Sequence, residues 1–367
     1  MKILEIINVD FALAQFLLPL LREGRAQGHE MVGVCADGPM LAQVRAEGFR
    51  VIAVPMVRSL SPFGQWRAFW ALRRVIRAER PDLVHAHMPI SGVLGRLAAK
   101  SCGVARIATT CHGFLFNQPG AKSRRLLAWL AEFAAARCTD VFLTVSQEEA
   151  ADAKKWLWVK HPVAVGNGAD PARFHPDPRA RARLRAEIGV PEDRVVILIA
   201  SRLVRHKGYP ELLAAMEQVP TGELWVVGER LASDHGEDME PYFAASTLGP
   251  RLRRLGWRDD MPALLAAADI FVLPSHFEGL PLAVIEAMHS GLAVIATDIR
   301  GARELITSGV DGLLVAPGSV EPLTDAINLL VSNHELRRRF AGRARARALA
   351  RYDEGTIARL TLDLLRQ

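Results

Sequence analysis

The sequence is poor in the features that mark disulfide scaffolds, zinc sites and membrane spans. It has only four cysteines and none of them form a Cys-x-x-Cys pair, so we expect neither a disulfide framework nor a zinc knuckle. Asp10, Asp269 and Glu286 interrupt the most apolar stretches before these reach the ~20 residues that a membrane span needs. Glu5 and Asp10 also interrupt what would have to be a signal-peptide core. We therefore expect a cytoplasmic protein.

Several motifs of nucleotide and metal chemistry are absent as well. There is no Gly-x4-Gly-Lys-Ser/Thr loop, no Gly-x-Ser-x-Gly elbow and no His-Glu-x-x-His zinc site, and Gly166-Asn167-Gly168 lacks the third glycine of a dinucleotide fingerprint. No Asp-x-Asp occurs, which removes the usual metal-ligand pair of metal-dependent nucleotide-sugar enzymes. We find no recognisable nucleic-acid-binding motif. The sequence thus predicts no bound metal and no nucleic-acid partner.

Length and pattern predict two α/β domains. The 367 residues exceed what one hydrophobic core usually serves, and 50% hydrophobic with 23% charged residues is an ordinary globular balance. Short β-rich runs alternate with helical stretches, the alternation restarts after the turn-rich segment 166–178, and alternation of this kind favours parallel sheets covered on both faces. The expected strands lie at 2–7, 30–35, 50–54, 82–87, 106–111, 141–145, 195–200, 224–228, 254–257, 270–274, 293–297 and 312–315. In such folds ligands bind outside the carboxyl ends of the strands, here in a cleft between the domains.

Positive charge is concentrated in the first half of the chain. Residues 1–166 contain 21 Lys and Arg against 13 Asp and Glu, a net charge of +8, and the remainder carries −2 of the total of +6. The stretches 64–80, 121–138 and 154–161 combine this charge with Trp and Leu. That combination suits an anionic membrane surface. The alternative, in which the tryptophans are core residues and the arginines a solvated rim, stays open.

The strongest single motif is PSHFEGLPLAVIEAMHSG (274–291), at the end of a predicted strand. Pro281 fits the first position of a helix that runs to about Ser290, and a turn into a helix N-terminus offers free N–H groups to a phosphate. Glu278 precedes this helix and Glu286 lies within it. Hydroxyl pairs of a ribose or a hexose would satisfy both acids; a structural glutamate bonded to backbone is the alternative.

A second motif, SRLVRHKG (201–208), follows the strand at 195–200. Arg202 and Lys207 are expected at the same sheet edge as Glu278, where two cations can neutralise a diphosphate leaving group. In the first half, His112 follows the strand at 106–111 and is expected to face the same cleft, and His87 is a weaker candidate of the same kind. Each of these residues, taken singly, is also compatible with a solvated loop position.

Together these motifs resemble the retaining glycosyltransferases of family 4, which have the GT-B fold of two doubly wound Rossmann-like domains facing a central cleft. EGLPLAVIE matches the E-x7-E signature, and SRLVRHKG, the His112-Gly113 pair, NGAD (167–170) and the segment 256–275 follow in the order the family has. The resemblance covers nearly the whole chain. It implies an acceptor-binding domain at 1–166, a nucleotide-sugar-binding domain at 167–351 and a terminal helix at 352–367 that crosses back onto the first domain.

The resemblance also implies roles for individual residues. Arg202 and Lys207 would bind the donor diphosphate, Glu286 the ribose, and Glu278 the transferred sugar, with His112 beside the reacting centre. The remaining donor contacts would come from Gly279, Leu280, Pro281, Trp257 and Arg258. Asp10, His87 and Asn167 would lie on the acceptor side. The family retains anomeric configuration without a metal or a clear enzymic nucleophile, the leaving phosphate being thought to take the acceptor proton.

One segment departs from the family pattern, since NVDFALAQFLLPLL (8–21) lacks the Gly-Gly pair that many members carry there. This variant resembles the branch that extends polyprenyl-diphosphate-linked oligosaccharides, often from UDP-N-acetylhexosamines. The prediction is therefore a hexosyltransferase that uses a UDP-sugar and a lipid-linked or glycan acceptor, peripheral on the inner face of the plasma membrane. A UDP-sugar epimerase and a catalytically idle, membrane-attached scaffold are the alternatives.

Overall fold

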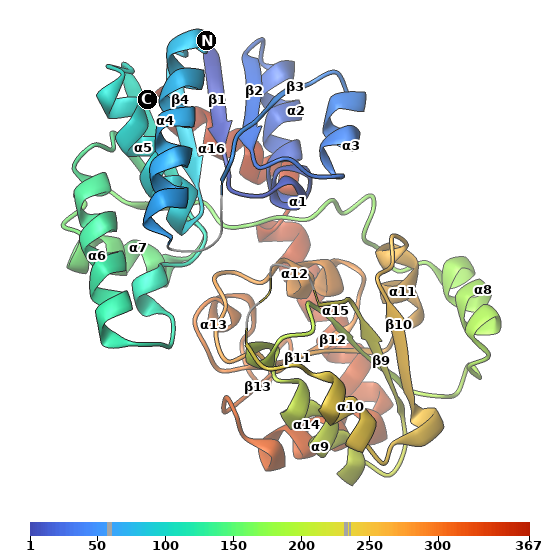
Figure 1. Cartoon of the computed structure of the whole chain (residues 1–367). Coiled ribbons are helices and arrows are strands. Elements are labelled where there is room, and N and C mark those ends of the chain that lie inside the picture. The colour runs from blue at the N-terminus through green and yellow to red at the C-terminus, as the bar shows by residue number, and fades with distance from the viewer. Residues whose placement is uncertain (57–60, 231–233, 235) are drawn as a thin grey trace. The chain divides into compact units, whose positions relative to one another are not determined.

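The computed structural model describes residues 1–367 except 57–60, 231–233 and 235. The chain divides into two compact units (Figure 1). The first unit comprises Met1–Gly166 together with Glu354–Gln367, and the second comprises Asn167–Asp353. Both chain termini therefore belong to the first unit. The division near the C-terminus falls after Asp353, two residues later than the expected start of the terminal helix at 352.

The first unit is built on a seven-stranded parallel sheet of order β3-β2-β1-β4-β5-β6-β7. Its central strands are almost wholly buried, as expected for a sheet covered on both faces, and they carry several polar side chains among the apolar ones. The strands are β1 Lys2–Ile6, β2 Glu30–Cys35, β3 Arg50–Ala53, β4 Leu83–His87, β5 Arg106–Cys111, β6 Val141–Thr144 and β7 Val163–Ala164.

Helices cover this sheet on both faces. One face packs on side chains from α2, α3 and the terminal helix, which contributes Ala358, Leu362 and Leu365 to the core, and the other face packs on α4 and α5. The helices are α1 Asp10–Ala12, a π-helix Leu13–Leu17, α2 Leu18–Ala26, α3 Leu41–Ala46, α4 Pro62–Glu79, α5 Pro89–Ser101, a 3₁₀ turn Leu115–Asn117, α6 Lys122–Ala136, α7 Gln147–Trp156 and α16 Glu354–Arg366.

The second unit repeats the architecture with a six-stranded parallel sheet of order β10-β9-β8-β11-β12-β13. The strands are β8 Val196–Ala200, β9 Glu223–Val227, β10 Leu252–Gly256, β11 Ile270–Leu273, β12 Ala293–Thr297 and β13 Leu313–Val315. The helical segments are α8 Pro178–Ile188, Arg205–Lys207 (3₁₀), α9 Tyr209–Gln218, α10 Glu240–Ala245, Gly249–Arg251 (3₁₀), α11 Met261–Ala267, α12 Leu282–His289, α13 Ala302–Leu305, α14 Val320–Ser332 and α15 His334–Arg351.

The expected fold class of two doubly wound parallel sheets is confirmed, with small differences at the ends of elements. Every strand expected from the sequence is present, with ends that differ by at most two residues. Strand β7 was missed because two residues carry no readable alternation. Helix α12 begins at Leu282, so Pro281 is its N-cap residue and not the first helical residue. The helix ends at His289 and Gly291 follows with a left-handed φ of 77°.

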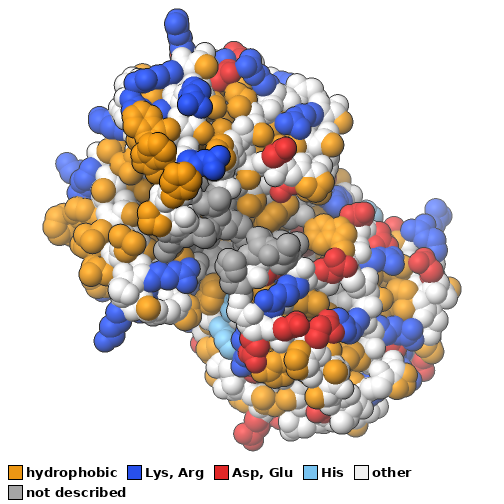
Figure 2. All heavy atoms as spheres, in the orientation of Figure 1, with side chains coloured by type: hydrophobic (Ala, Val, Ile, Leu, Met, Phe, Trp, Pro, Cys, Tyr) orange, Lys and Arg blue, Asp and Glu red, His pale blue; other side chains and the backbone are white. Residues whose placement is uncertain are grey.

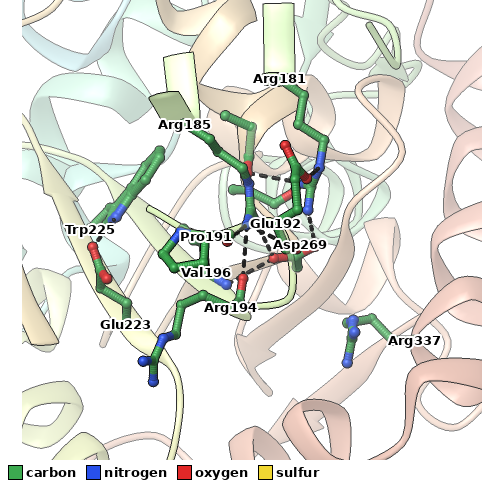
Figure 3. A network of polar contacts seen from close by, with 12 residues as sticks. Arg181, Arg185, Pro191, Glu192, Arg194, Val196, Glu223, Trp225, Asp269 and Arg337 are labelled. Atoms are coloured by element: carbon green, nitrogen blue, oxygen red, sulfur yellow. Dashed lines mark hydrogen bonds and ion pairs between the residues drawn. The ribbon is translucent and has the colours of Figure 1, made fainter. Parts of the chain in front are cut away.

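A buried arginine holds α8 to the amino edge of the second sheet (Figure 3). The guanidinium of Arg185, 1% exposed, donates to Asp269 at 2.7 Å and to the backbone carbonyls of Ala267, Pro191 and Arg194. Because every guanidinium N–H group must find a partner once it leaves water, this dense set of acceptors is what makes the burial tolerable. A cavity of about 440 Å³ opens beside this network. It lies at the strand starts, away from the carboxyl edge.

Among the helices formed by described residues, none is both long and apolar enough to span a bilayer.

Candidate active site

Two loops of the second unit meet where neighbouring strands β8 and β11 end. The strands pair directly, and the loop after β8 carries Arg202 and Lys207 while the loop after β11 carries Glu278. His206 stacks on Phe277 with ring centroids 4.5 Å apart, and the N–H of His276 donates to the carbonyl of His206 at 2.8 Å. These contacts fix the two loops against each other at the sheet edge where ligands of parallel sheets bind.

The predicted cations of this edge each contact a carboxylate. The Nζ of Lys207 lies 2.6 Å from Oε1 of Glu278, and both side chains are largely buried, with 15% and 13% of their surfaces exposed. Arg202 forms an ion pair with Asp234, whose side chain is 2% exposed. The structure therefore brings Lys207 and Glu278 into direct contact and holds Arg202 on the same loop. Asp234 was not among the sequence candidates, since no motif surrounds it.

The electrostatic effect of both cations is visible at His206. Burial lowers the pKa of this imidazole most, and the positive charges of Lys207 and Arg202 lower it further, to about 4. His206 is therefore neutral at pH 7, although the carboxylates of Glu278 and Asp234, which pair with the two cations, oppose part of this effect. An anionic ligand at this edge would have to compete with these carboxylates for the two cations.

Two glycines allow the loops to approach closely enough to shape this site. Gly208 has a φ of 78°, and a Cβ there would lie 2.1 Å from the carbonyl oxygen of Pro274. Gly301, with a φ of 74°, lies so close to the turn before α12 that a Cβ would stand 1.7 Å from the carbonyl oxygen of Gly279. Only glycine fits at either position. The sequence analysis did not single out Gly301. A glycine a few residues after the end of β12, at the carboxyl edge of the sheet, was the signal that could have found it.

Asn167 joins the same turn from the start of the second unit. Its Nδ2 donates to the carbonyl of Leu280 at 2.8 Å. The structure thus places this residue, which the resemblance assigned to the acceptor side, against the EGLP turn. Pro281 has no side-chain acceptor, so no cap competes for the first N–H groups of α12. Glu286 lies within α12 and is half-buried.

The candidate base-binding segment follows β10. The N–H of Trp257 donates to Glu229 at 3.2 Å, and its indole Nε1 donates to Asp259 at 3.1 Å, while half of the side chain is exposed. Arg258 makes a bidentate ion pair with Asp260, at 2.7 and 2.6 Å. An exposed indole beside an ordered main chain is compatible with stacking of a nucleobase.

In the first unit a buried polar cluster lies at the carboxyl ends of β1, β4 and β5. Oε2 of Glu5 lies 2.7 Å from Nε2 of His87 and 3.0 Å from Nδ1 of His85, and Nδ1 of His87 lies 3.2 Å from Nε2 of His112. The strand register explains the meeting, because Glu5 pairs with His85 across β1 and β4. Of this cluster the sequence analysis named His87 and His112 and missed Glu5 and His85. Two signals could have found them: His85 and His87 alternate on one strand and so point to the same face, and Glu5 is an acid inside a largely apolar strand.

The ionisation states in this cluster follow from burial and mutual contact. Burial would raise the pKa of Glu5, but the two imidazoles outweigh it and bring the pKa to about 2. Burial, assisted by the electrostatic influence of the adjacent His85 imidazole, lowers the pKa of His87 to about 4 despite the Glu5 carboxylate. The pKa of His112 is held well below its ordinary value by burial and by the two other imidazoles. At neutral pH the cluster therefore contains an ionised Glu5 and neutral imidazoles at 87 and 112.

The atypical first loop reaches this cluster through an aromatic contact. The ring of Phe16, in the π-helix, packs edge-on against His112 with centroids 5.9 Å apart. Asp10 accepts the N–H of Met40 at 3.0 Å and lies where a Cβ on Gly38 would clash. The acidic residue named on the acceptor side thus anchors a neighbouring turn.

Comparison with known proteins agrees with this arrangement of motifs. Residues 180–347 match the family described as glycosyl transferases group 1, and residues 12–168 match the glycosyl transferase 4-like domain. The chain is 30% identical over 302 residues, 80% of its length and 78% of the relative's, to the UDP-Gal:alpha-D-GlcNAc-diphosphoundecaprenol alpha-1,3-galactosyltransferase of Escherichia coli. It is 29% identical to the putative glycosyltransferase EpsD of Bacillus subtilis, over 99% of this chain and 96% of that one. The chain belongs to the group 1 glycosyltransferase family.

Solved structures share the fold over the whole chain. The sucrose-phosphate synthase of Thermosynechococcus elongatus aligns with a TM-score of 0.87 at 21% identity, covering 100% of this chain and 99% of that one. HepE of Anabaena, solved in complex with UDP-glucose, aligns with a TM-score of 0.84 at 23% identity and with the same coverage. The two doubly wound units are thus those of the GT-B fold, and the protein is a glycosyltransferase.

Proposed function

We propose that this glycosyltransferase moves a hexose or N-acetylhexosamine from a UDP-sugar to a polyprenyl-diphosphate-linked glycan, with retention of configuration and without a metal. The observation that carries the proposal is the pairing of Lys207 with Glu278 at the carboxyl edge of the second sheet, beside the N-terminus of α12. A cation and the N–H groups at a helix N-terminus suit the charged phosphate oxygens of a sugar diphosphate, and a carboxylate suits the hydroxyls of its sugar.

The donor would lie along this edge of the second unit. In the proposal Lys207 and Arg202 neutralise the diphosphate as negative charge develops on it, and such stabilisation of a developing charge is usually the largest catalytic term. Glu278 hydrogen-bonds the hydroxyls of the transferred sugar, assisted by the main chain at Gly279, Leu280 and Pro281. Glu286 would bind the ribose. The segment at Trp257 and Arg258 would receive the base.

The chemistry needs no metal in this proposal because protein cations take the place that a divalent ion would fill. The sequence has no Asp-x-Asp pair to hold such an ion beside the diphosphate. The Escherichia coli relative is named for an alpha-1,3 product. A donor whose sugar is alpha-linked to diphosphate would then react with retention, the leaving phosphate accepting the acceptor's proton on the same face. His112 of the first unit would contact the sugar at the reacting centre.

The lipid-linked acceptor is supported by two relatives and by the surface of the first unit. The Escherichia coli relative and an N-acetylgalactosaminyltransferase of Campylobacter jejuni, 25% identical over 96% of this chain and 95% of its own length, are both named for undecaprenol-linked substrates. In this proposal the first unit binds the acceptor and the second binds the donor. The terminal helix α16 contributes its apolar face to the core of the first unit.

The first unit also carries an exposed face of the composition that binds anionic membranes (Figure 2). In this view hydrophobic side chains gather over α4 and α6 among Lys and Arg. On α4, Trp66 is 60% exposed and stacks on Phe63, with Arg67 over the Phe63 ring. Further exposed apolar residues on or next to α4, α6 and α7 are Trp70, Leu126, Leu127, Leu130, Trp156 and Trp158.

The exposure of these residues supports the membrane-surface interpretation of the basic stretches. The tryptophans of α4 are not core residues, because each exposes 42% or more of its surface. Trp129, by contrast, packs against Phe133 and donates to the carbonyl of Trp156. Exposed indoles beside cations suit the headgroup region of a bilayer. We therefore propose peripheral attachment at the inner face of the plasma membrane through α4 and α6.

The decisive experiment is a transfer assay with the full chain. Purified protein is incubated with radiolabelled UDP-galactose, UDP-glucose, UDP-N-acetylglucosamine or UDP-N-acetylgalactosamine, a polyprenyl-diphosphate-linked saccharide and an excess of EDTA. We expect transfer of one of these sugars, undiminished by EDTA, and an alpha linkage in the product by NMR. Loss of transfer with EDTA contradicts metal independence, and a beta linkage from the alpha-linked donor contradicts retention. Conversion of the UDP-sugar without any acceptor would favour the epimerase alternative.

A further inference from the structure

The cluster formed by Glu5, His85, His87 and His112 in the first unit contains an ordered chain of hydrogen bonds. Glu5 and His87 are fully or almost fully buried, at 0% and 2% exposure, while His112 is half-buried. The chain runs from Oε2 of Glu5 to Nε2 of His87 over 2.7 Å, and from Nδ1 of His87 to Nε2 of His112 over 3.2 Å. It leads from the sheet interior to a residue on the loop after β5.

The direction of each hydrogen bond follows from the chemistry of its atoms. An ionised carboxylate only accepts, so Nε2 of His87 must carry a proton and donate to Glu5. A neutral imidazole has one N–H, so Nδ1 of His87 is an acceptor. Nε2 of His112 must then be the donor in the second bond. The proton of neutral His112 is thereby placed on Nε2, and Nδ1 is left with its lone pair.

The surrounding backbone holds this chain in place. Met88, which follows His87 directly, has a φ of 66° and a ψ of 162°, a region that residues other than glycine rarely enter. Such a conformation persists only where neighbouring contacts enforce it. Here the carbonyl of His87 accepts the Ser91 hydroxyl at 2.5 Å, and Thr109 donates to the carbonyl of Ala86 at 2.8 Å.

We propose that Glu5 and His87 are positioning residues that hold His112 in the Nε2–H tautomer, so that its Nδ1 accepts a hydrogen bond from a hydroxyl of the bound sugar. No described residue hydrogen-bonds to that nitrogen. With Nδ1 fixed as an acceptor, His112 can bind a sugar hydroxyl, which donates a hydrogen, but not an oxygen atom that carries none. Because the imidazole is already held in place, it orients the sugar without a further loss of side-chain entropy. This inference rests on the proposed function, in which His112 contacts the sugar.

The same three side chains, Glu5, His85 and His87, could in principle ligate a metal ion. The geometry favours hydrogen bonding, because Glu5 Oε2 already lies 2.7 and 3.0 Å from the two ring nitrogens, whereas tetrahedral zinc separates its ligand atoms by about 3.3 Å. The three side chains are also buried, at 2% exposure or less. The metal content of the purified protein distinguishes the two interpretations.

The direct test is the tautomer of His112 in the intact chain. Protein labelled with ¹⁵N at histidine is studied by long-range ¹H–¹⁵N correlation between pH 6 and 8, and His112→Asn assigns the signal. We expect a protonated Nε2 in the native sequence and a mixture of tautomers in Glu5→Gln and His87→Gln. In the transfer assay both variants should lower kcat roughly 10²-fold, the usual loss when a reacting group is misplaced, with the donor KM changed only a few-fold.

His85→Gln is the matched control, since His85 is equally buried and contacts Glu5 but not His112. It should keep the Nε2–H tautomer of His112 and most of kcat, although it removes the same type of side chain from the same strand. If His85→Gln and His87→Gln lower kcat equally, or if all variants keep one tautomer, the residues only support the fold and the proposal is wrong. The expected tautomer together with unequal losses supports it.

Two further outcomes separate this inference from the proposed function. Full activity of His112→Asn would overturn the proposed contact between His112 and the sugar, even with the tautomer as expected, and would leave the transferase proposal intact. A protonated Nδ1 in the native sequence, with His112→Asn inactive, would overturn the positioning proposal and leave the transferase proposal intact. Stoichiometric metal in the purified protein, measured by plasma mass spectrometry and lost in Glu5→Gln, would also overturn the hydrogen-bond interpretation.

Discussion

Glu278 is proposed both to neutralise Lys207 and to bind the hydroxyls of the transferred sugar, and its replacement by glutamine separates these two roles. In the structure the carboxylate neutralises Lys207 at 2.6 Å, with about one seventh of each side chain exposed. A donor phosphate must compete with Glu278 for that ammonium group. Removing the charge should therefore free Lys207 for UDP, and a pair of this exposure is worth about 1 kcal/mol, which corresponds to an affinity increase of about fivefold. Turnover should nevertheless fall by roughly 10²–10³, because the sugar loses its contact.

The assay combines calorimetric titration of UDP with the sugar-transfer rate. Lys207→Ala is the contrasting variant, and it should lose both UDP affinity and turnover, the latter by roughly 10²–10³. Glu223→Gln is the control, because Glu223 is also buried and paired, with Arg253, but begins β9 at the opposite edge of the sheet. It should leave UDP affinity unchanged. Weaker UDP binding in Glu278→Gln than in the native chain, or undiminished turnover, would refute the shared donor site.

Three further outcomes follow from other parts of the molecule. Asp269→Ala leaves the 1%-exposed Arg185 without its carboxylate, so the free energy of unfolding of the second unit should fall by about 3–5 kcal/mol. Hydrogen exchange of β8 peptides measures this loss, and a loss below about 1 kcal/mol contradicts the role of the pair. The first unit should lose stability as pH falls from 6.5 to about 4, because the pKa of His87 is lowered to about 4 in the folded chain and the unfolded chain protonates this imidazole at higher pH. Hydrogen exchange of β4 peptides measures the stability, and His87→Gln should flatten its dependence on pH. Trp66→Ser combined with Leu127→Ser should reduce flotation with anionic vesicles, whereas Leu329→Ser, 44% exposed in the second unit, should not; equal flotation of all three proteins contradicts membrane attachment through α4 and α6.

Local patterns in the sequence were sufficient for the architecture and for the donor motifs. Short strands of two to six residues alternate with helical stretches, and parallel order follows because each strand is separated from the next by a helix. The positions of Arg202, Lys207 and Glu278 at one sheet edge could be predicted because all three follow strands, and parallel strands end together. Pro281 was placed one residue too far inside its helix, since proline is common at the first helical position but here occupies the N-cap.

The cluster around Glu5 shows what the sequence alone did not reveal. Glu5 and His87 are 82 residues apart, and only the pairing of β1 with β4 makes them neighbours. Likewise, nothing near Asp234 indicated that it would pair with Arg202, and the exposure of Trp66 could not be distinguished from burial by its helical spacing. Sequence determined the type of element and the chemistry at the strand ends, because those depend on local propensity. Tertiary structure decided which carboxylate meets which cation or imidazole, because strand register and close backbone approach, as at Gly301 and Gly279, depend on contacts between distant segments.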